Sequence, residues 1–164
     1  MRWKNNGTTT TEIPYVYDDW NRLISYNGQT IAYDDFGNPS NWRDLTNLNY
    51  KHRRLISCTA GANQLQYAYN GNGMRVSKTV NGVETERYYY QGNNLVGIWR
   101  KAGNHMQFVY DQTGVCGTWY NGQLYSFTKN VFGDITGIIA GDGPLTALYE
   151  YDAWGKFTLM SENL

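Results

Sequence analysis

The sequence has few of the residues that stabilise small secreted proteins or attract charged partners. Of 164 residues, two are cysteines and three are prolines, and 17% are charged, against ~25% in typical soluble domains. Cys58 and Cys116 each lack a neighbouring cysteine, which excludes a CxxC zinc site and a disulfide framework. The sequence favours two free thiols over a single bridge. A formal net charge of zero provides no basic face, so we expect no nucleic-acid partner.

Long apolar runs are also missing. No stretch approaches the ~18 apolar residues of a membrane span, and residues 2–11 are polar, unlike the core of a signal peptide. No window longer than ten residues repeats apolar positions every ~3.6 residues, as an amphipathic helix would. The sequence therefore predicts no membrane span and essentially no helix.

Aromatic residues, in contrast, are abundant and recur in a pattern. The chain has 15 tyrosines and six tryptophans, too many for a disordered protein. A short phrase, clearest at Tyr67-Ala68-Tyr69-Asn70, occurs eight times, which indicates one supersecondary unit used repeatedly. Its second aromatic position recurs at intervals of 16 to 22 residues, at Tyr17, Tyr33, Tyr50, Tyr69, Tyr90, Tyr110, Lys129 and Tyr151.

Two kinds of turn alternate along the repeats. In most copies an Asp or Asn follows the aromatic pair and a Gly stands three residues later, as in Asn70 with Gly73, which is typical of a four- to five-residue hairpin connection. About ten residues further on, Asn27-Gly28, Asn81-Gly82 and Asn121-Gly122 predict two-residue type I′ turns. Strands of ~5–7 residues fit between such turns.

These patterns predict an all-β fold, an antiparallel β-meander of repeated β-hairpins forming a curved, twisted sheet. We expect a flexible lead-in at residues 1–12, a repeat domain of about eight repeats at 13–160 and a truncated tail at 161–164. Because the array begins and ends in mid-pattern, we expect the natural protein to continue beyond this chain. A repeat array with open edge strands should also self-associate through those edges.

The repeats resemble a known family. Tyr15-Val16-Tyr17-Asp18-Asp19-Trp20 and Tyr149-Glu150-Tyr151-Asp152-Ala153-Trp154 are similar to the tyrosine–aspartate (YD) repeat of RHS proteins, and residues 130–139 resemble the segment near the end of an RHS core. The resemblance implies a slice of an RHS-type β-shell, in a secreted or surface-exposed, wall-associated bacterial protein. Its partners would be further repeats of the same protein or the C-terminal toxin that the shell encloses.

The tryptophans that do not follow the repeat are the candidate binding residues. Exposed tryptophans could stack on carbohydrate, and the less periodic ones are Trp20, Trp42, Trp99, Trp119 and Trp154. The tyrosine ladder, which recurs in every unit, is explained better by packing between repeats as cross-strand aromatic pairs.

Catalytic and metal-binding patterns are weak. Asp18-Asp19 and Asp34-Asp35 place two carboxylates in succession, but adjacent strand residues point to opposite faces, and the first Asp of each pair is explained by its turn. His52 and His105 each stand alone. The sequence predicts no catalytic residue, metal site or cofactor, and hence no enzyme.

The sequence therefore predicts a non-catalytic structural repeat domain that contributes wall to a shell enclosing or presenting a C-terminal toxin. The alternative is a carbohydrate-binding or self-assembling module of a cell-wall-associated protein. A groove lined by tryptophan would favour the alternative.

Overall fold

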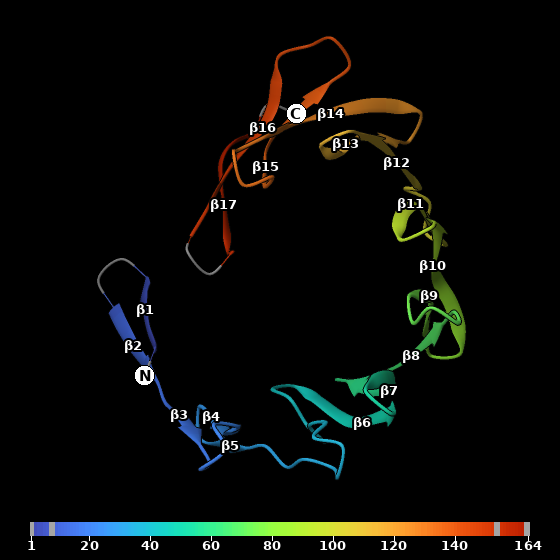
Figure 1. The fold of residues 1–164 in the computed structure, drawn as a ribbon. Helices are drawn as coiled ribbons and strands as arrows, with labels where there is room; N and C mark the ends of the chain where they lie inside the picture. The colour runs from blue at the N-terminus through green and yellow to red at the C-terminus, as the bar shows by residue number, and fades with distance from the viewer. Residues whose placement is uncertain (1, 7–8, 153–154, 163–164) are drawn as a thin grey trace. The chain divides into compact units, whose positions relative to one another are not determined.

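The fold consists of β-strands and turns. The computed structural model describes residues 2–6, 9–152 and 155–162, and these form seventeen strands and no helix (Figure 1). No helix in this part of the chain is thus long and apolar enough to cross a membrane. Every pairing between strands is antiparallel and joins consecutive elements, as in β7 (Arg54–Ala60) with β8 (Asn63–Tyr69). The predicted all-β meander of hairpins is confirmed.

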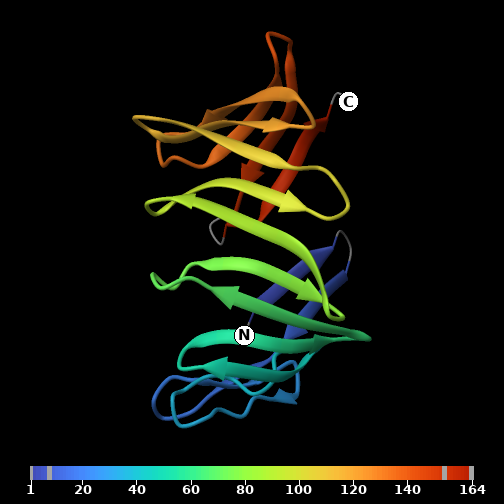
Figure 2. The same ribbon diagram turned by 90° about the vertical axis from the view of Figure 1, so that its right-hand side faces the viewer.

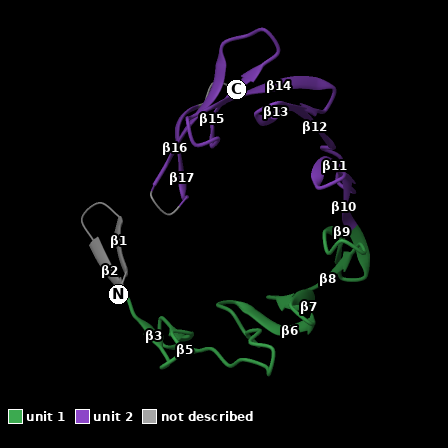
Figure 3. Cartoon of the chain, viewed as in Figure 1, with its two compact units in different colours: residues 1–84 green, residues 85–164 purple. Residues whose placement is uncertain are grey.

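The chain divides into two compact units, residues 1–84 and 85–164 (Figure 3). The first contains a hairpin of β1 (Arg2–Asn6) and β2 (Thr9–Ile13), which the sequence does not predict because the threonine run shows no alternation. A three-stranded sheet and a four-stranded meander follow. Their strands are β3 (Tyr15–Tyr17), β4 (Leu23–Tyr26) and β5 (Gln29–Thr30), then β6 (Leu45–Lys51), β7, β8 and β9 (Arg75–Val80).

The second unit is a continuous meander in which each strand pairs with the next along the chain. Figure 2 shows its strands following one another as a ladder of hairpins. They are β10 (Val83–Gln91, starting just before the boundary), β11 (Asn94–Arg100), β12 (Met106–Asp111), β13 (Gly114–Tyr120), β14 (Gln123–Lys129), β15 (Ile135–Ala140), β16 (Leu145–Tyr151) and β17 (Phe157–Glu162).

The second copy of the repeat departs from the regular hairpin. Its turn at Asp34 is present, but the flanking segments are reduced to isolated bridges that pair Tyr33 with Pro39 and Trp42 with Leu45. Proline has no N–H to donate to a ladder, so Pro39 limits the strand that could form here. The other prolines, Pro14 and Pro144, lie directly beside strand ends as the sequence predicts.

The interior is thin. Within the described residues the buried apolar side chains are those of Ile31, Cys58 and Ala147, and no side chain falls below 2% exposure. Cys58 and Cys116 are both free thiols. Stability must therefore come from contacts between adjacent strands and turns, because the sheet has little separate core.

Candidate functional site

The recurring Asp or Asn of each repeat holds its turn through backbone hydrogen bonds. Asn70 Oδ1 accepts from the N–H groups of Asn72 and Met74, at 3.1 and 3.0 Å. Asp34 and Asn130 repeat this arrangement with the residues two and four further on. The Gly three residues after each of them has positive φ, 82° for Gly73, and in the first copy Asn21 at 60° takes that place. The predicted turn role of these residues is confirmed.

The type I′ turns are confirmed as well. Asn81 and Gly82 have φ of 50° and 80°, and Asn27-Gly28 and Asn121-Gly122 are almost identical. The side chain of Asn81 also reaches the preceding hairpin, where its Oδ1 accepts from Gln64 N at 2.8 Å and its Nδ2 donates to Asn63 Oδ1 at 3.0 Å. Asn121 Nδ2 donates in the same way to Asn104 Oδ1 at 3.0 Å, so the side chains of Asn81 and Asn121 link consecutive hairpins.

The tyrosine at the second aromatic position joins its repeat to the previous one through its hydroxyl in several copies. Tyr69 Oη donates to the carbonyl of Leu55 at 2.8 Å, and Leu55 is the strand partner of Tyr50, the equivalent residue one copy earlier. The same bond recurs from Tyr33 to Leu23 at 2.7 Å, from Tyr110 to Leu95 at 2.9 Å and from Tyr151 to Ile135 at 2.6 Å. We call this contact the tyrosine link.

A β-bulge accompanies each link. The strand after the turn carries one extra residue directly after the accepting carbonyl, for example Ile56 after Leu55, and the register shifts there. The same shift occurs at Ile24, Val76, Val96, Cys116 and Thr136. A bulge disrupts the ladder locally, which leaves the carbonyl before the extra residue able to accept the phenol.

The seventh copy uses a lysine in place of the tyrosine. Lys129 Nζ donates to the carbonyl and the hydroxyl of Thr113 in the preceding turn, at 3.1 and 3.2 Å. The sequence marks Lys129 as a departure from the motif, and the structure shows that a cation reaches back to the previous repeat in the same manner as the tyrosines.

The pKa values of the turn carboxylates are lowered by their hydrogen bonds. The pKa of Asp111 is lowered chiefly by the hydroxyl of Thr113, which donates to Oδ1 at 2.7 Å, with a smaller contribution from the charge of Lys129. The backbone N–H of Arg22 lowers the pKa of Asp18, and the side-chain amide of Asn38 lowers that of Asp34. Asp34 and Asp111 are exposed and Asp18 is half-buried, and all three act as hydrogen-bond acceptors in turns.

The five candidate tryptophans do not form one site. Trp20 lies at the tip of the first turn, 80% exposed, with the Arg22 guanidinium 5.1 Å from its ring centroid. Trp42 packs against Tyr26, with ring centroids 5.4 Å apart. Trp154 lies outside the described residues. Trp99 and Trp119 line the same hollow in the second unit.

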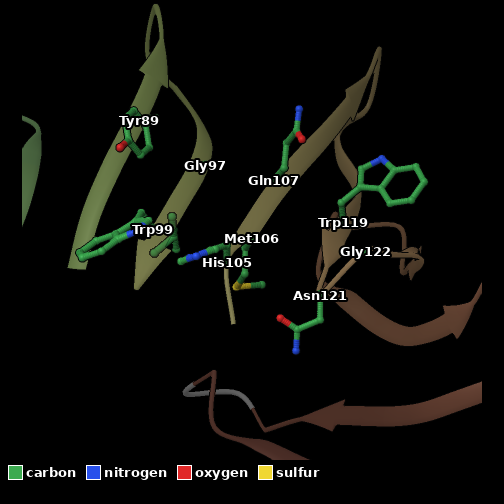
Figure 4. Close-up of a pocket in the computed structure, with 10 residues that line it drawn as sticks. Tyr89, Gly97, Trp99, His105, Met106, Gln107, Trp119, Asn121 and Gly122 are labelled. Carbon is green, nitrogen blue, oxygen red and sulfur yellow. The ribbon is translucent and has the colours of Figure 1, made fainter. Parts of the chain in front are cut away.

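This hollow, of about 520 Å³, extends over β10 to β13 (Figure 4). The strand registers pair Tyr89 with Gly97, Gly97 with Gln107 and Gln107 with Trp119, so the four residues form one row across one face of the sheet. Gly97 contributes no side chain, which leaves the row open beside Tyr89. We call the hollow the Tyr89–Trp119 groove.

One end of the groove is closed by a pair of stacked rings. The Trp99 and His105 rings are 15° from parallel with centroids 6.0 Å apart, and His105 Nδ1 accepts from Arg100 N at 3.1 Å. This bond engages Nδ1 and leaves Nε2 as the other polar atom of the ring. Asn121 of the type I′ turn also lines the groove.

The opposite face of the second unit carries a smaller and more apolar hollow of about 320 Å³. Its lining includes Tyr120 and Tyr125, whose rings meet edge to face with centroids 6.3 Å apart. Such contacts agree with the expected aromatic packing between adjacent strands.

Sequence reasoning missed Tyr89, Gly97, Gln107 and Asn121 as neighbours of the tryptophans. The strand register would have predicted these neighbours, but the register can be derived from the sequence only if the position of each bulge is known. His52 forms part of the turn between β6 and β7, and among the described residues no group of three or more His, Cys, Asp or Glu could hold a metal ion.

Comparison with known proteins finds relatives that are named as tRNA nucleases. The chain is 30% identical over 145 residues to the tRNA3(Ser)-specific nuclease WapA of Bacillus spizizenii, and 32% identical to the tRNA nuclease WapA of Bacillus subtilis. It is 31% identical to the tRNA(Glu)-specific nuclease WapA of Bacillus subtilis subsp. natto. Each match covers 84% of this chain.

Two predictions are therefore wrong. The identification as an RHS fragment is not upheld, because no family model matches the chain and the relatives are named as tRNA nucleases. The recurring tyrosine and Asp or Asn of the YD phrase are explained by the tyrosine link and by the turns. The phrase therefore indicates a local structure, and by itself it does not identify a family. The prediction that the protein is not an enzyme fails because all three relatives are named for a nuclease activity. The chain spans only about 6% of the length of these curated relatives, so it is similar to a small part of a tRNA nuclease.

Proposed function

We propose that this chain is a repeat scaffold within a larger bacterial protein that acts as a tRNA nuclease toxin, secreted or displayed at the cell surface. The scaffold encloses or presents the nuclease part. The observation that supports this most directly is the match of 145 residues, which runs over the repeats and lies within proteins named as tRNA nucleases.

The contacts of the described residues suit a scaffold. Each tyrosine link connects one repeat to the preceding one, as Tyr110 does to Leu95 and Tyr151 to Ile135. Since every repeat depends on its neighbour, the array can be extended by adding units, and its stability rises with their number. A wall built in this way needs no large core, in agreement with the few buried side chains.

The test begins with the open reading frame that encodes the chain. If it continues into further repeats and another domain, the whole protein and the 164-residue chain are each incubated with purified tRNA, and cleavage is followed on a denaturing gel. The proposal expects cleavage by the whole protein. Cleavage of tRNA by the isolated chain would overturn the scaffold role, since the chemistry would then lie within these strands.

The enclosing role has its own measurement. Limited proteolysis of the whole protein should leave the nuclease part intact, whereas removal of the repeats matching residues 13–160 should expose it to digestion. Equal digestion with and without the repeats would contradict enclosure, and the scaffold would then only present the nuclease part.

A further inference from the structure

The Tyr89–Trp119 groove is the place in the second unit where exposed aromatic rings and amide groups converge. Tyr89 and Trp119 are 48% and 44% exposed, which is high for large rings on the face of a sheet. Three strand spacings separate them, about 14 Å, because they lie on β10 and β13 of consecutive antiparallel strands. Gln107 lies between them on β12 (Figure 4).

The floor of the groove is open because of a glycine. A Cβ built on Gly97 would lie 3.5 Å from the Met106 carbonyl oxygen and 3.6 Å from Tyr89 Cδ2, which are ordinary contacts. A methyl group would therefore fit at this position, and a larger side chain would extend from it into the space beside Tyr89. The openness is a property of the residue at position 97, and the fold itself does not require it.

The polar groups of the groove include two side-chain amides and an imidazole. The amide of Gln107 offers both a donor and an acceptor, and Asn121 keeps an amide at the rim while its Nδ2 donates to Asn104 Oδ1 at 3.0 Å. The Nδ1 of His105 is engaged by the backbone N–H of Arg100, and its Nε2 is the remaining polar atom of the ring. No Asp, Glu, Lys or Arg is among the lining residues of the groove.

We infer that the Tyr89–Trp119 groove is a binding site for a neutral saccharide chain, of the kind found in wall and surface glycans. Aromatic faces carry partial negative charge and attract the slightly positive C–H groups of sugar rings, while amides bind the hydroxyl groups. The volume of about 520 Å³ lies within the ordinary range of ligand sites. This inference does not rest on the proposed scaffold role.

RNA is the competing ligand, because bases also stack on aromatic rings. Binding of nucleic acid depends strongly on Lys and Arg that neutralise phosphates, and neither is among the lining residues. Arg87 is the strand partner of Trp99 on this face but does not line the groove. The lining therefore favours an uncharged ligand over a polyanion.

The test titrates the 164-residue chain with an N-acetylglucosamine tetrasaccharide, cellotetraose and, separately, oligouridylate. Binding is measured by calorimetry and by the NMR signal of the Trp119 indole N–H, at ligand concentrations up to about 10 mM, which detects millimolar dissociation constants. We expect one or both neutral saccharides to bind and to shift the Trp119 signal.

Four variants localise the binding. Trp119→Ala, Tyr89→Ala and Gly97→Leu should each weaken it by about tenfold or more, since the first two remove a stacking ring and the third fills the floor. Tyr89→Phe keeps the ring and should retain binding. Trp20→Ala removes an exposed tryptophan of the first unit and is the matched control, with binding unchanged.

Three outcomes would overturn the inference. They are no saccharide binding over the whole range, saccharide binding that survives both Trp119→Ala and Tyr89→Ala in folded protein, and oligouridylate binding that these variants abolish. The last would assign the groove to RNA. Circular dichroism of each variant verifies that a loss of binding is not a loss of fold.

Discussion

Tyr69 on β8 donates its phenolic proton to the backbone carbonyl of Leu55 on β7, with the two oxygens 2.8 Å apart. This bond crosses from one repeat to the one before it, and Tyr33, Tyr110 and Tyr151 make the same bond in other copies. The bond explains why tyrosine recurs at this position: the hydroxyl makes the link, and the ring packs between the strands.

Replacing Tyr69 by Phe should lower the free energy of unfolding by ~0.5–1.5 kcal/mol, because the ring is kept and one partly buried hydrogen bond is lost. Urea denaturation followed by tryptophan fluorescence measures the change. Tyr17→Phe is the matched control, since this tyrosine is the first of the array and 52% exposed. Equal effects of the two substitutions would show that the link contributes nothing.

The turns could be predicted from the sequence because their bonds are local. Asn70 and Gly73 satisfy their own segment within five residues, so the residue types alone identify the geometry. The tyrosine link could not be predicted, because the accepting carbonyl lies 14 residues earlier and is made available by a bulge. A small residue follows each bulge, such as Ser57 or Gly117, and this is the trace that the bulge leaves in the sequence.

The Tyr89–Trp119 groove could be predicted from the sequence only in part. The residue type identifies Trp99 and Trp119 as candidates, but Trp20 and Trp42 share that type and lie elsewhere. Only the register across three pairs of strands brings Trp119 into one row with Tyr89, and a single misplaced bulge would move it to the other face. The nuclease activity named for the relatives could not be read from these residues either, because turn and link residues report only the contacts within and between neighbouring hairpins.

The pKa of Asp111 should respond to its two partners in a definite order. Thr113→Val removes the hydroxyl that lowers this pKa most. Lys129→Met removes a nearby positive charge, together with the bonds from its Nζ to Thr113, and leaves the hydroxyl of Thr113 beside Asp111. Both substitutions should raise the pKa towards that of an ordinary aspartate, and Thr113→Val should raise it further. Carboxyl carbon NMR titration measures both values. A larger effect of Lys129→Met would mean that charge dominates over the hydrogen bond.

Acid should destabilise the protein through the turn carboxylates. The pKa values of Asp18, Asp34 and Asp111 are lowered in the folded chain, so between those values and the unfolded value of ~3.9 the unfolded state binds more protons. Their stabilising effect is therefore complete above about pH 5 and is lost as the pH falls through the folded values.

Thermal unfolding between about pH 7 and pH 2 tests this dependence. Asp111→Asn should flatten the acid limb, because asparagine holds the equivalent turn at Asn70 and Asn130 without titrating. If this variant loses as much thermal stability at low pH as the wild type does, Asp111 does not contribute to the acid destabilisation.

The glycines that follow the bulges should differ in their tolerance of a methyl group. A Cβ at Gly117 would lie 2.6 Å from the Tyr125 carbonyl oxygen, whereas at Gly97 the nearest atom is 3.5 Å away. Gly117→Ala should therefore destabilise by ~1–3 kcal/mol, and Gly97→Ala should be close to neutral. Urea denaturation of the two variants under the same conditions measures the difference. Similar losses at both positions would contradict the steric explanation.

The outer edge of β17 should mediate self-association of this chain. Among the described residues β17 pairs with β16 alone, and its Phe157, Leu159 and Met160 are 60%, 42% and 50% exposed. An exposed apolar edge strand presents unpaired N–H and C=O groups that recruit another chain, and a lysine on such a strand opposes the pairing. Light scattering across a concentration series should show dimers or larger species for the wild type and a shift to monomer for Met160→Lys. The matched control is Val83→Lys, which places the same charge on a residue that is 44% exposed on β10 and should leave the association unchanged. A wild-type chain that stays monomeric at every concentration would exclude the edge of β17 as an association site. The twist or the side chains of β17 would then protect its unpaired backbone groups.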